Sequence, residues 1–477
     1  MVASSKRKWY ALGLLCMTQF LVVLDIAIVN VALPSIQSDL HFSQENLQWV
    51  ISAYALVFGG FLLLGGRIAD LLGRRRLFFA GLILFTVGSL LCGLAWSEGS
   101  LIAFRAFQGL GAATISPAAL SILTTTFAEG RERNIALGAW GAVGGVGAAA
   151  GVLLGGILTD LLSWSWIFFV NVPVGVAALV FTPILLVESR DEKTKSFDAL
   201  GAVLVTSGLV LLVLGITKGH DWDWASGRTI GVFAVSAVIL VAFLVWESRH
   251  HEPLMPLSIF KLQTLTAATV SGLILGTALF AMFLMLTLYM QQVLGYSPLK
   301  TGVAYLAVAG TAIIWANVAA QVVNRVGVKP ALVFGMVMMT VGLLYFTRVS
   351  VGGSYLGDLL PGFLIIGLGM PFCFIPITIA SLAGTKPEEA GLASGLINTS
   401  QQVGGALGIA VLSTVATSGF HAGVRPSFAQ LTHGFQNAFW VGAGVSAVGV
   451  LVSVFLVRRS DVESQVASAQ EVVADAV

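Results

Sequence analysis

Long runs of apolar residues, separated by short links that hold most of the charge, dominate this chain of 477 residues. Charged residues make up 10% of it, against about 25% in soluble domains. A helix needs roughly 20 mostly apolar residues to cross a bilayer, and fourteen stretches approach or exceed that length. A transmembrane β-barrel would instead alternate polar and apolar residues in segments of about ten. The pattern predicts an all-α polytopic membrane protein.

The predicted spans also suggest a domain organisation. We expect a six-helix bundle over residues 1–190, two inserted helices with their flanks over 191–260, a second six-helix bundle over 261–459 and a polar tail over 460–477. The fourteen spans are placed at 9–32, 47–69, 77–96, 99–123, 135–159, 166–187, 198–217, 229–247, 264–291, 301–323, 330–348, 355–381, 391–417 and 436–457.

The distribution of Lys and Arg predicts the orientation. An even number of spans places both ends on one side, and nineteen basic residues lie on that side against five on the other. Because basic residues beside membrane spans stay in the cytoplasm, we expect a multi-pass protein of the cytoplasmic membrane with both termini inside. The basic N-terminus precedes an apolar run without a small-x-small cleavage site, so the run is interpreted as a retained first helix rather than a signal peptide.

The link between the second and third spans, from Gly65 to Arg76, is short, basic and rich in glycine. It also carries Asp70, which topology alone does not require, so the turn is a candidate functional part. A weaker copy follows the tenth span, where Asn324 matches Asp70 and Gly327 matches Gly73. Two related halves are typical of secondary transporters, which bind substrate between the halves near mid-membrane. Chance similarity of short basic turns is the alternative.

Asp25 in the first span and Arg105 in the fourth are the principal ionisable residues predicted to lie inside the membrane. Such groups are costly in lipid, and so they are usually paired or functional. From the predicted outer ends, Ala32 and Gly99, both lie about 10 Å deep, which permits pairing. A carboxylate held between a cation and an apolar environment is a candidate proton carrier. A purely structural ion pair is the alternative.

Neutral polar and aromatic side chains in the spans are candidates for a substrate cavity, and they suit an amphipathic organic molecule better than a small inorganic ion. Ordinary helix packing is the alternative for each of them. The candidates are Asn30, Gln108, Phe283, Tyr289, Gln292, Trp315, Asn398 and Gln402.

Glycines recur through the fifth span, including Gly147, Gly151, Gly155 and Gly156. Small residues four apart let helices approach closely, so this span is interpreted either as a tightly packed helix or as a seal between moving halves. No GxxxxGK[ST] phosphate loop and no HExxH motif occurs. The three cysteines lie apart in apolar segments, without metal-ligand spacing. We expect no enzyme activity, catalytic residue, metal or cofactor, and nothing in the net charge of +2 points to nucleic acid.

Together these segments resemble the major facilitator superfamily, and within it the fourteen-helix drug:proton antiporters. The resemblance covers nearly the whole chain. The matching motifs are Gly66–Arg76, Leu24–Pro34, Arg105–Gly111, Gly147–Gly156, Trp164–Gly175 and Gly391–Gln402. The chain departs from the motifs at Val152, where the antiporter motif usually has proline, and at Ser165 and Gln401, where arginine is common.

The resemblance implies two six-helix bundles plus two inserted helices, working as a monomer by alternating access. It implies that Asp25 and Arg105 couple transport to protons. It also implies that the turn with Gly66, Asp70, Gly73, Arg74 and Arg75 gates the conformational change. The expected function is proton-driven export of hydrophobic or amphipathic drugs, powered by the proton gradient alone.

A dedicated exporter of one antibiotic or metabolite is the nearest alternative, which a transport panel would separate. A channel or a non-transporting receptor is the alternative from another class, although neither explains two halves with matching turns, and uphill flux would exclude a channel. An intramembrane enzyme lacks a visible nucleophile–base pair or metal set.

Overall fold

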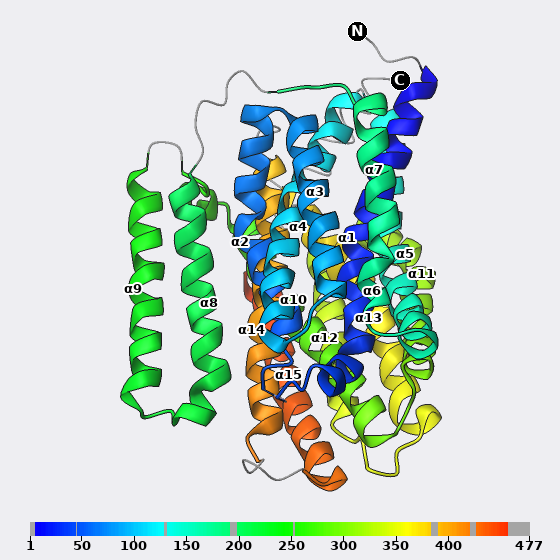
Figure 1. The fold of residues 1–477 in the computed structure, drawn as a ribbon, viewed down its shortest axis with the longest axis vertical. Helices are drawn as coiled ribbons and strands as arrows, with labels where there is room; N and C mark the ends of the chain where they lie inside the picture. The colour runs from blue at the N-terminus through cyan, green and yellow to red at the C-terminus, as the bar shows by residue number, and fades with distance from the viewer. Residues whose placement is uncertain are drawn as a thin grey trace. The chain divides into compact units, whose positions relative to one another are not determined.

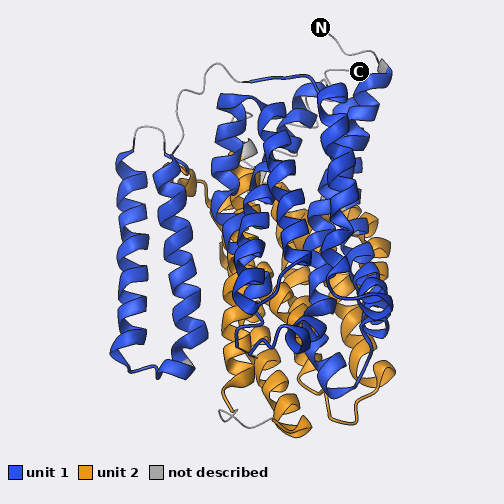
Figure 2. Cartoon of the chain, in the orientation of Figure 1, with its two compact units in different colours: residues 1–254, 286–306 blue, residues 255–285, 307–477 orange. Residues whose placement is uncertain are grey.

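The computed structural model describes residues 5–43, 45–127, 131–190, 198–250, 253–382, 390–419 and 426–456. It divides into two compact units, residues 1–254 with 286–306 and residues 255–285 with 307–477 (Figure 2). No strand occurs in the described ranges. The predicted tail, 460–477, lies outside them, and the predicted domain boundaries remain a prediction.

Among the described residues, unit 1 holds the first nine helices, which are labelled in Figure 1. They are α1 (Ser5–Asp39), α2 (Trp49–Leu72), α3 (Arg74–Gly93), α4 (Glu98–Thr126), α5 (Arg131–Leu161), α6 (Trp166–Phe169), α7 (Asn171–Leu185), α8 (Ala199–Trp222) and α9 (Gly227–Arg249). It also contains the end of α10, the π-helical turn η2 (Tyr289–Val293) and the beginning of α11 (Pro298–Val326).

Unit 2 contains the remaining elements. They are the 3₁₀ turn η1 (Leu257–Lys261), most of α10 (Gln263–Leu288), the rest of α11, α12 (Val328–Phe346), the π-helical turn η3 (Tyr355–Leu359), α13 (Leu360–Leu382), α14 (Ala390–Thr417) and α15 (Phe428–Phe455).

The membrane-spanning helices of the structure agree with the spans predicted from the sequence. Among the described residues, twelve helices are long and apolar enough to cross a membrane. They match twelve of the predicted spans, and α5 and α14 occupy the positions of the other two. In α5 the apolar stretch Val146–Leu161 is shorter than these twelve helices. The predicted all-α polytopic fold is therefore confirmed.

Some predicted helix ends were wrong. The first span was expected to end at Ala32, but α1 continues through Pro34 to Asp39. A proline removes only one backbone donor, and neighbouring side chains in a membrane protein can satisfy the carbonyls around it. Here Gln291 Nε2 donates to Val31 O at 2.7 Å. The depth of Asp25 in the membrane, which was counted from Ala32, stays a prediction.

Two further boundaries differ for local reasons. The last span was expected from residue 436, but α15 begins at Phe428 because Ser427 and Gln430 form a reciprocal capping box at its N-terminus. The sixth span was expected to be continuous, but it is divided at Val170 into the short α6 and the longer α7. Asn171 therefore occupies the first position of α7.

The inserted helices α8 and α9 form a hairpin, and α8 packs on α2 of the same unit. Gln48 Nε2 donates to Thr217 Oγ1 at 2.8 Å near one end of α8. Further along, Thr206 lies so close to Gly60 that a Cβ there would collide with the threonine side chain. At the other end Leu64, Ala202 and Leu254 share an apolar cluster with residues of α2. Figure 1 shows the hairpin beside the other helices of its unit.

Candidate functional site

Asp25 on α1 and Arg105 on α4 form a fully buried ion pair. Arg105 Nη1 lies 2.6 Å from Asp25 Oδ2, and the two side chains are 1% and 0% exposed. Burying two charges is expensive unless their mutual attraction and further hydrogen bonds compensate. The surroundings of both groups therefore decide whether the pair is stable in this form.

Two amide side chains complete the environment of the carboxylate. Gln108 Nε2 donates to Asp25 Oδ1 at 2.8 Å, and Asn171 Nδ2 donates to the same oxygen at 2.9 Å. Gln108 Nε2 also donates to Ser89 Oγ at 2.8 Å. All three partners of Asp25 donate, which is the arrangement that suits an ionised carboxylate.

The guanidinium is held as closely as the carboxylate. Arg105 Nη1 donates to Gln108 Oε1 at 2.6 Å, and Nε donates to Val50 O at 2.9 Å. Its Cζ lies 4.3 Å from the ring centroid of Tyr54 and 5.6 Å from that of Phe168. Planar stacking on aromatic rings is favourable for arginine and not for lysine. The geometry thus fixes a guanidinium at this position rather than a generic cation.

The sequence identified Asp25 and Arg105, but several other side chains of the network around them were not predicted as site residues. Tyr54, Ser89 and Asn171 come from α2, α3 and α7, and all are buried. Gln108 was expected in a substrate cavity, whereas the structure places it inside the ion-pair network. Asn171 lies within a motif that the sequence did reveal, but nothing in that motif showed its contact with Asp25.

The basic turn between α2 and α3 contains a backbone conformation that requires glycine. Gly73 has φ +113°, and its N–H donates to Ala69 O at 3.1 Å. Arg74 forms an ion pair with Asp70, with Nη2 and Oδ1 2.8 Å apart. In the turn after α11, Gly327 has φ +90° and donates to Val323 O at 2.9 Å. The two turns share this glycine geometry; the Asn324 side chain lies outside the described residues.

Glu188, which was not predicted as a site residue, caps the beginning of α3. Its Oε1 accepts from Arg75 N at 3.1 Å, and its Oε2 accepts from Arg76 N at 3.2 Å. Gly73 precedes this helix and has no side chain with which to cap it. A carboxylate at a helix N-terminus is stabilised by the unpaired N–H groups there. Glu188 thereby links the end of the sixth span to the basic turn. As the one acid in the segment from Leu186 to Arg190, it could have been noticed in the sequence.

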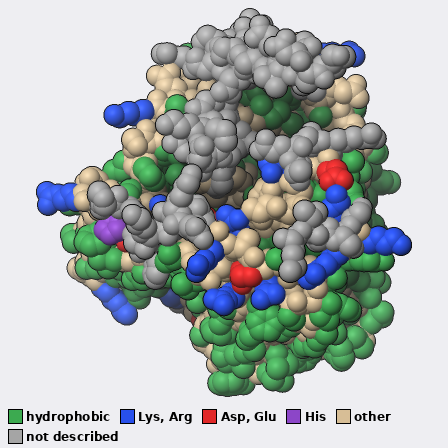
Figure 3. Space-filling model, turned by 90° about the horizontal axis from the view of Figure 1, so that it is seen from above, with side chains coloured by type: hydrophobic (Ala, Val, Ile, Leu, Met, Phe, Trp, Pro, Cys, Tyr) green, Lys and Arg blue, Asp and Glu red, His purple; other side chains and the backbone are tan. Residues whose placement is uncertain are grey.

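Figure 3 shows Lys and Arg side chains on the face of the molecule that is seen from above. Arg74 is 15% exposed and pairs with Asp70, whereas the Arg76 side chain is 77% exposed. Arg75 Nε lies 3.8 Å from Glu188 Oε2. Hydrophobic side chains cover the flanks that the figure shows, as expected for a surface between lipid and water.

We expect Gly73→Ala to destabilise the protein by about 1–3 kcal/mol, because a non-glycine residue is strained at positive φ. The added Cβ would also lie 2.7 Å from Glu188 Oε1, disturbing the cap of α3. Gly66→Ala is the matched control, since its Cβ would lie 3.6 Å from Pro117 Cβ, an ordinary contact. The measurement is the thermal unfolding temperature of the purified protein in detergent. Equal unfolding temperatures for the two variants would contradict the assignment of strain to Gly73.

The glycines of α5 lie against two neighbours within unit 1. A Cβ on Gly151 would lie 2.6 Å from Ala27 Cβ, and one on Gly155 would lie 2.7 Å from Ile28 O, both on α1. A Cβ on Gly156 would lie 2.7 Å from Pro298 O at the beginning of α11. Gly147 makes a looser approach to Val23 at 3.2 Å. Replacing these glycines would therefore separate α5 from both neighbours.

The predicted cavity residues are divided between the units. Asn30, Gln108, Tyr289 and Gln292 belong to unit 1, and Phe283, Trp315, Asn398 and Gln402 belong to unit 2.

The contacts of these residues vary. Asn30 Nδ2 donates to Ile26 O on its own helix at 3.1 Å, and Gln292 Nε2 donates to Gln37 Oε1 at 3.0 Å. Tyr289 is fully buried in η2, whereas Trp315 is 38% exposed. Asn398 Nδ2 donates to Ser394 O on its own helix at 3.1 Å. Their role in substrate binding stays a prediction.

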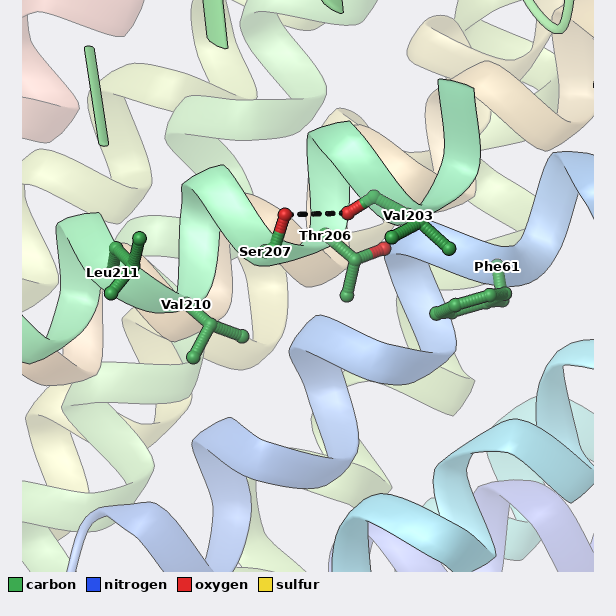
Figure 4. Close-up of a pocket in the computed structure, with 6 residues that line it drawn as sticks. All are labelled: Phe61, Val203, Thr206, Ser207, Val210 and Leu211. Atoms are coloured by element: carbon green, nitrogen blue, oxygen red, sulfur yellow. Dashed lines mark hydrogen bonds between the residues drawn. The ribbon is translucent and has the colours of Figure 1, made fainter. Parts of the chain in front are cut away.

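An open crevice of about 480 Å³ lies between α2 and α8 (Figure 4). It is lined by Phe61, Val203, Thr206, Ser207, Val210 and Leu211. The Ser207 hydroxyl, drawn with its hydrogen bond in the figure, donates to Val203 O at 2.7 Å. None of the predicted cavity residues lines this crevice. Across the ranges that the structure describes, no group of three His, Cys, Asp or Glu side chains could hold a metal.

Comparison with known proteins supplies the family. The sequence model of the Major Facilitator Superfamily matches residues 15–409. The chain belongs to the Major Facilitator Superfamily. This member is 39% identical to the puromycin resistance protein pur8 of Streptomyces alboniger, over 98% of this chain and 93% of the relative. It is 39% identical to the cephamycin export protein CmcT of Amycolatopsis lactamdurans, over 93% and 91% of the two chains.

A solved structure supports the major facilitator fold independently. The crystal structure of the peptide transporter POT in complex with sulfate superposes with a TM-score of 0.67, covering 94% of each chain at 16% identity. At that identity the likeness concerns the fold alone. Fold and family together make this major facilitator a multi-pass membrane transporter.

Proposed function

We propose that this protein exports hydrophobic or amphipathic antibiotic-like compounds across the cytoplasmic membrane in exchange for protons. The observation that carries the proposal is the buried Asp25–Arg105 pair, with its two additional amide donors. The names of relatives that span almost the whole chain, a puromycin resistance protein and a cephamycin export protein, support the substrate class.

Protonation of Asp25 is the proposed driving step. In the described state the carboxylate neutralises Arg105. When a proton neutralises Asp25, Arg105 becomes an uncompensated buried charge, and breaking such a pair costs about 3–5 kcal/mol. A two-state equilibrium moves from 1:99 to 99:1 for about 5.5 kcal/mol. The free-energy cost of protonating Asp25 is therefore large enough to change the preferred conformation substantially.

The proposed mechanism also assigns roles to the basic turn and to α5. The turn containing Gly66, Asp70, Gly73, Arg74 and Arg75 gates the change, and the glycine face of α5 allows close packing in one state. Both termini lie in the cytoplasm, the protein acts as a monomer in the lipid bilayer, and the proton gradient replaces any cofactor.

Export of a single compound is the second candidate. The two relatives described above are each named for one antibiotic, which favours a dedicated exporter. The breadth of the substrate range distinguishes this candidate from a multidrug antiporter.

The deciding experiment is transport into energised inverted membrane vesicles, using a panel of fluorescent dyes and antibiotics that includes puromycin and a cephamycin. We expect uphill transport of amphipathic compounds that a protonophore abolishes. Transport of several unrelated compounds indicates a multidrug antiporter, and transport of one indicates a dedicated exporter. Uphill transport that is indifferent to the protonophore would refute proton coupling.

A further inference from the structure

Asn171 differs from the other partners of Asp25 in having an unused acceptor. Arg105 carries no acceptor at all. The Oε1 of Gln108 accepts from Arg105 Nη1 at 2.6 Å. Asn171 is 0% exposed, yet none of the described residues donates to its Oδ1. Of the three partners, only Asn171 can therefore accept a hydrogen bond from Asp25 without losing one elsewhere.

A buried acceptor without a donor requires an explanation. Native proteins satisfy nearly all buried polar atoms, and the exceptions often have a functional reason. The Asn171 amide can rotate about χ2, a broad and roughly two-fold torsion. Half a turn would exchange Nδ2 and Oδ1, placing an acceptor where a donor now contacts Asp25 Oδ1.

The two protonation states of Asp25 need opposite partners. The carboxylate is an acceptor only, whereas the protonated acid has an O–H that must donate. We propose that Asn171 is an amide switch, which donates to the charged carboxylate and rotates to accept from the protonated one. This inference rests on the proposed proton coupling and deepens it by naming the group that stabilises the protonated state. Asn171 is a positioning residue in this scheme, because Asp25 carries the proton.

The other groups around Asp25 leave this role to Asn171. The charged or titratable neighbours are Arg105 on α4, Tyr54 on α2 and Cys92 on α3. The Tyr54 hydroxyl is also buried without a partner among the described residues, but it makes no hydrogen bond to Asp25.

The remaining neighbours of α1 bring no charge to this site. The packed glycines Gly147, Gly151 and Gly155 form the contact of α5, and Phe168 is the α6 residue beside the guanidinium. Among the described residues, neither α5 nor α6 places a titratable side chain beside Asp25.

Infrared difference spectroscopy on the purified full-length protein, recorded between high and low pH, tests the switch. The probe is the carbonyl band of protonated Asp25, assigned by its loss in Asp25→Asn. In Asn171→Leu, which has nearly the same shape, we expect this band to shift to higher frequency because the acid has lost its acceptor. Thr182→Val is a matched control, since the Thr182 hydroxyl donates only to Ala178 O on the same helix at 2.7 Å. Tyr54→Phe removes the competing hydroxyl, and neither control should move the band.

The outcomes separate the switch from the proposed function. An Asp25 band that is unchanged in Asn171→Leu, or that moves in Tyr54→Phe instead, overturns the switch and leaves proton coupling intact. Absence of any Asp25 band in the unsubstituted protein contradicts the proton site itself, and the switch with it.

Transport kinetics provide a second measurement. Because Asn171→Leu removes a hydrogen bond from both states of Asp25, we expect proton-driven transport to slow about tenfold at both ends of the pH profile. Asn171→Ser, whose hydroxyl both donates and accepts, should be faster than Asn171→Leu. A profile in Asn171→Leu that merely moves along the pH axis without losing height would show Asn171 to be a simple donor, and would overturn the switch.

Discussion

Asp25→Asn is expected to abolish uphill, proton-driven export while leaving the protein folded in the membrane. Asparagine resembles the protonated aspartic acid in shape but cannot release a proton. The transport cycle therefore stops at the step in which residue 25 must lose its proton. The measurement is accumulation of a transported dye in inverted vesicles with a proton gradient. Because the neutral side chain mimics one working state, exchange of substrate without a gradient should persist.

The control for this experiment is Asp160→Asn, which removes an exposed carboxylate near the end of α5. It should accumulate dye like the unsubstituted protein. If Asp25→Asn still accumulated dye against its gradient, another residue would have to carry the proton.

Arg105→Leu should lower the free energy of unfolding by about 3–5 kcal/mol, because removal of one partner leaves a buried charge uncompensated. The loss here includes the hydrogen bond to Val50 O at 2.9 Å and the stacking on Tyr54. The measurement is the free energy of unfolding of the purified protein in detergent, obtained from a thermal or denaturant titration.

The double variant Asp25→Asn with Arg105→Leu is the informative comparison. Since neither charge remains, we expect it to be more stable than Arg105→Leu alone. Residues in direct contact commonly show interaction energies of 0.5–3 kcal/mol in such cycles. Strictly additive effects would mean that the two groups do not stabilise one another.

The positions of the membrane-spanning helices and the pairing of Asp25 with Arg105 could be expected from the sequence for clear physical reasons. Apolar length identifies a membrane span, and a charge within a span is rare enough to be conspicuous. The end of α1 was harder to locate, because Pro34 normally marks a boundary and here the helix passes through it. Only the tertiary contacts that satisfy the surrounding carbonyls show that the helix continues.

The surroundings of Asp25 were less predictable. A helix that is apolar on all sides has no polar face, so periodicity does not show which residues turn toward a given neighbour. Asn171 and Ser89 are ordinary polar residues in their own segments. Asn171 reaches Asp25 only because α7 packs on α1, and Ser89 joins the network through Gln108 because α3 packs on α4. Glu188 stands out in the sequence only as the one acid of its short segment, and no spacing rule reveals that it accepts from the backbone N–H groups of Arg75 and Arg76.

The docking of the α8–α9 hairpin on α2 offers a convenient attachment point for a spectroscopic label. Val238 on α9 is 67% exposed, so a spin label or fluorophore placed there would not disturb the buried core. The contacts at Gln48 and Gly60 couple the hairpin to α2, and α2 leads directly into the basic turn. A label at residue 238 can therefore report movements of that helix during turnover, while leaving the proton site and the gating turn chemically untouched.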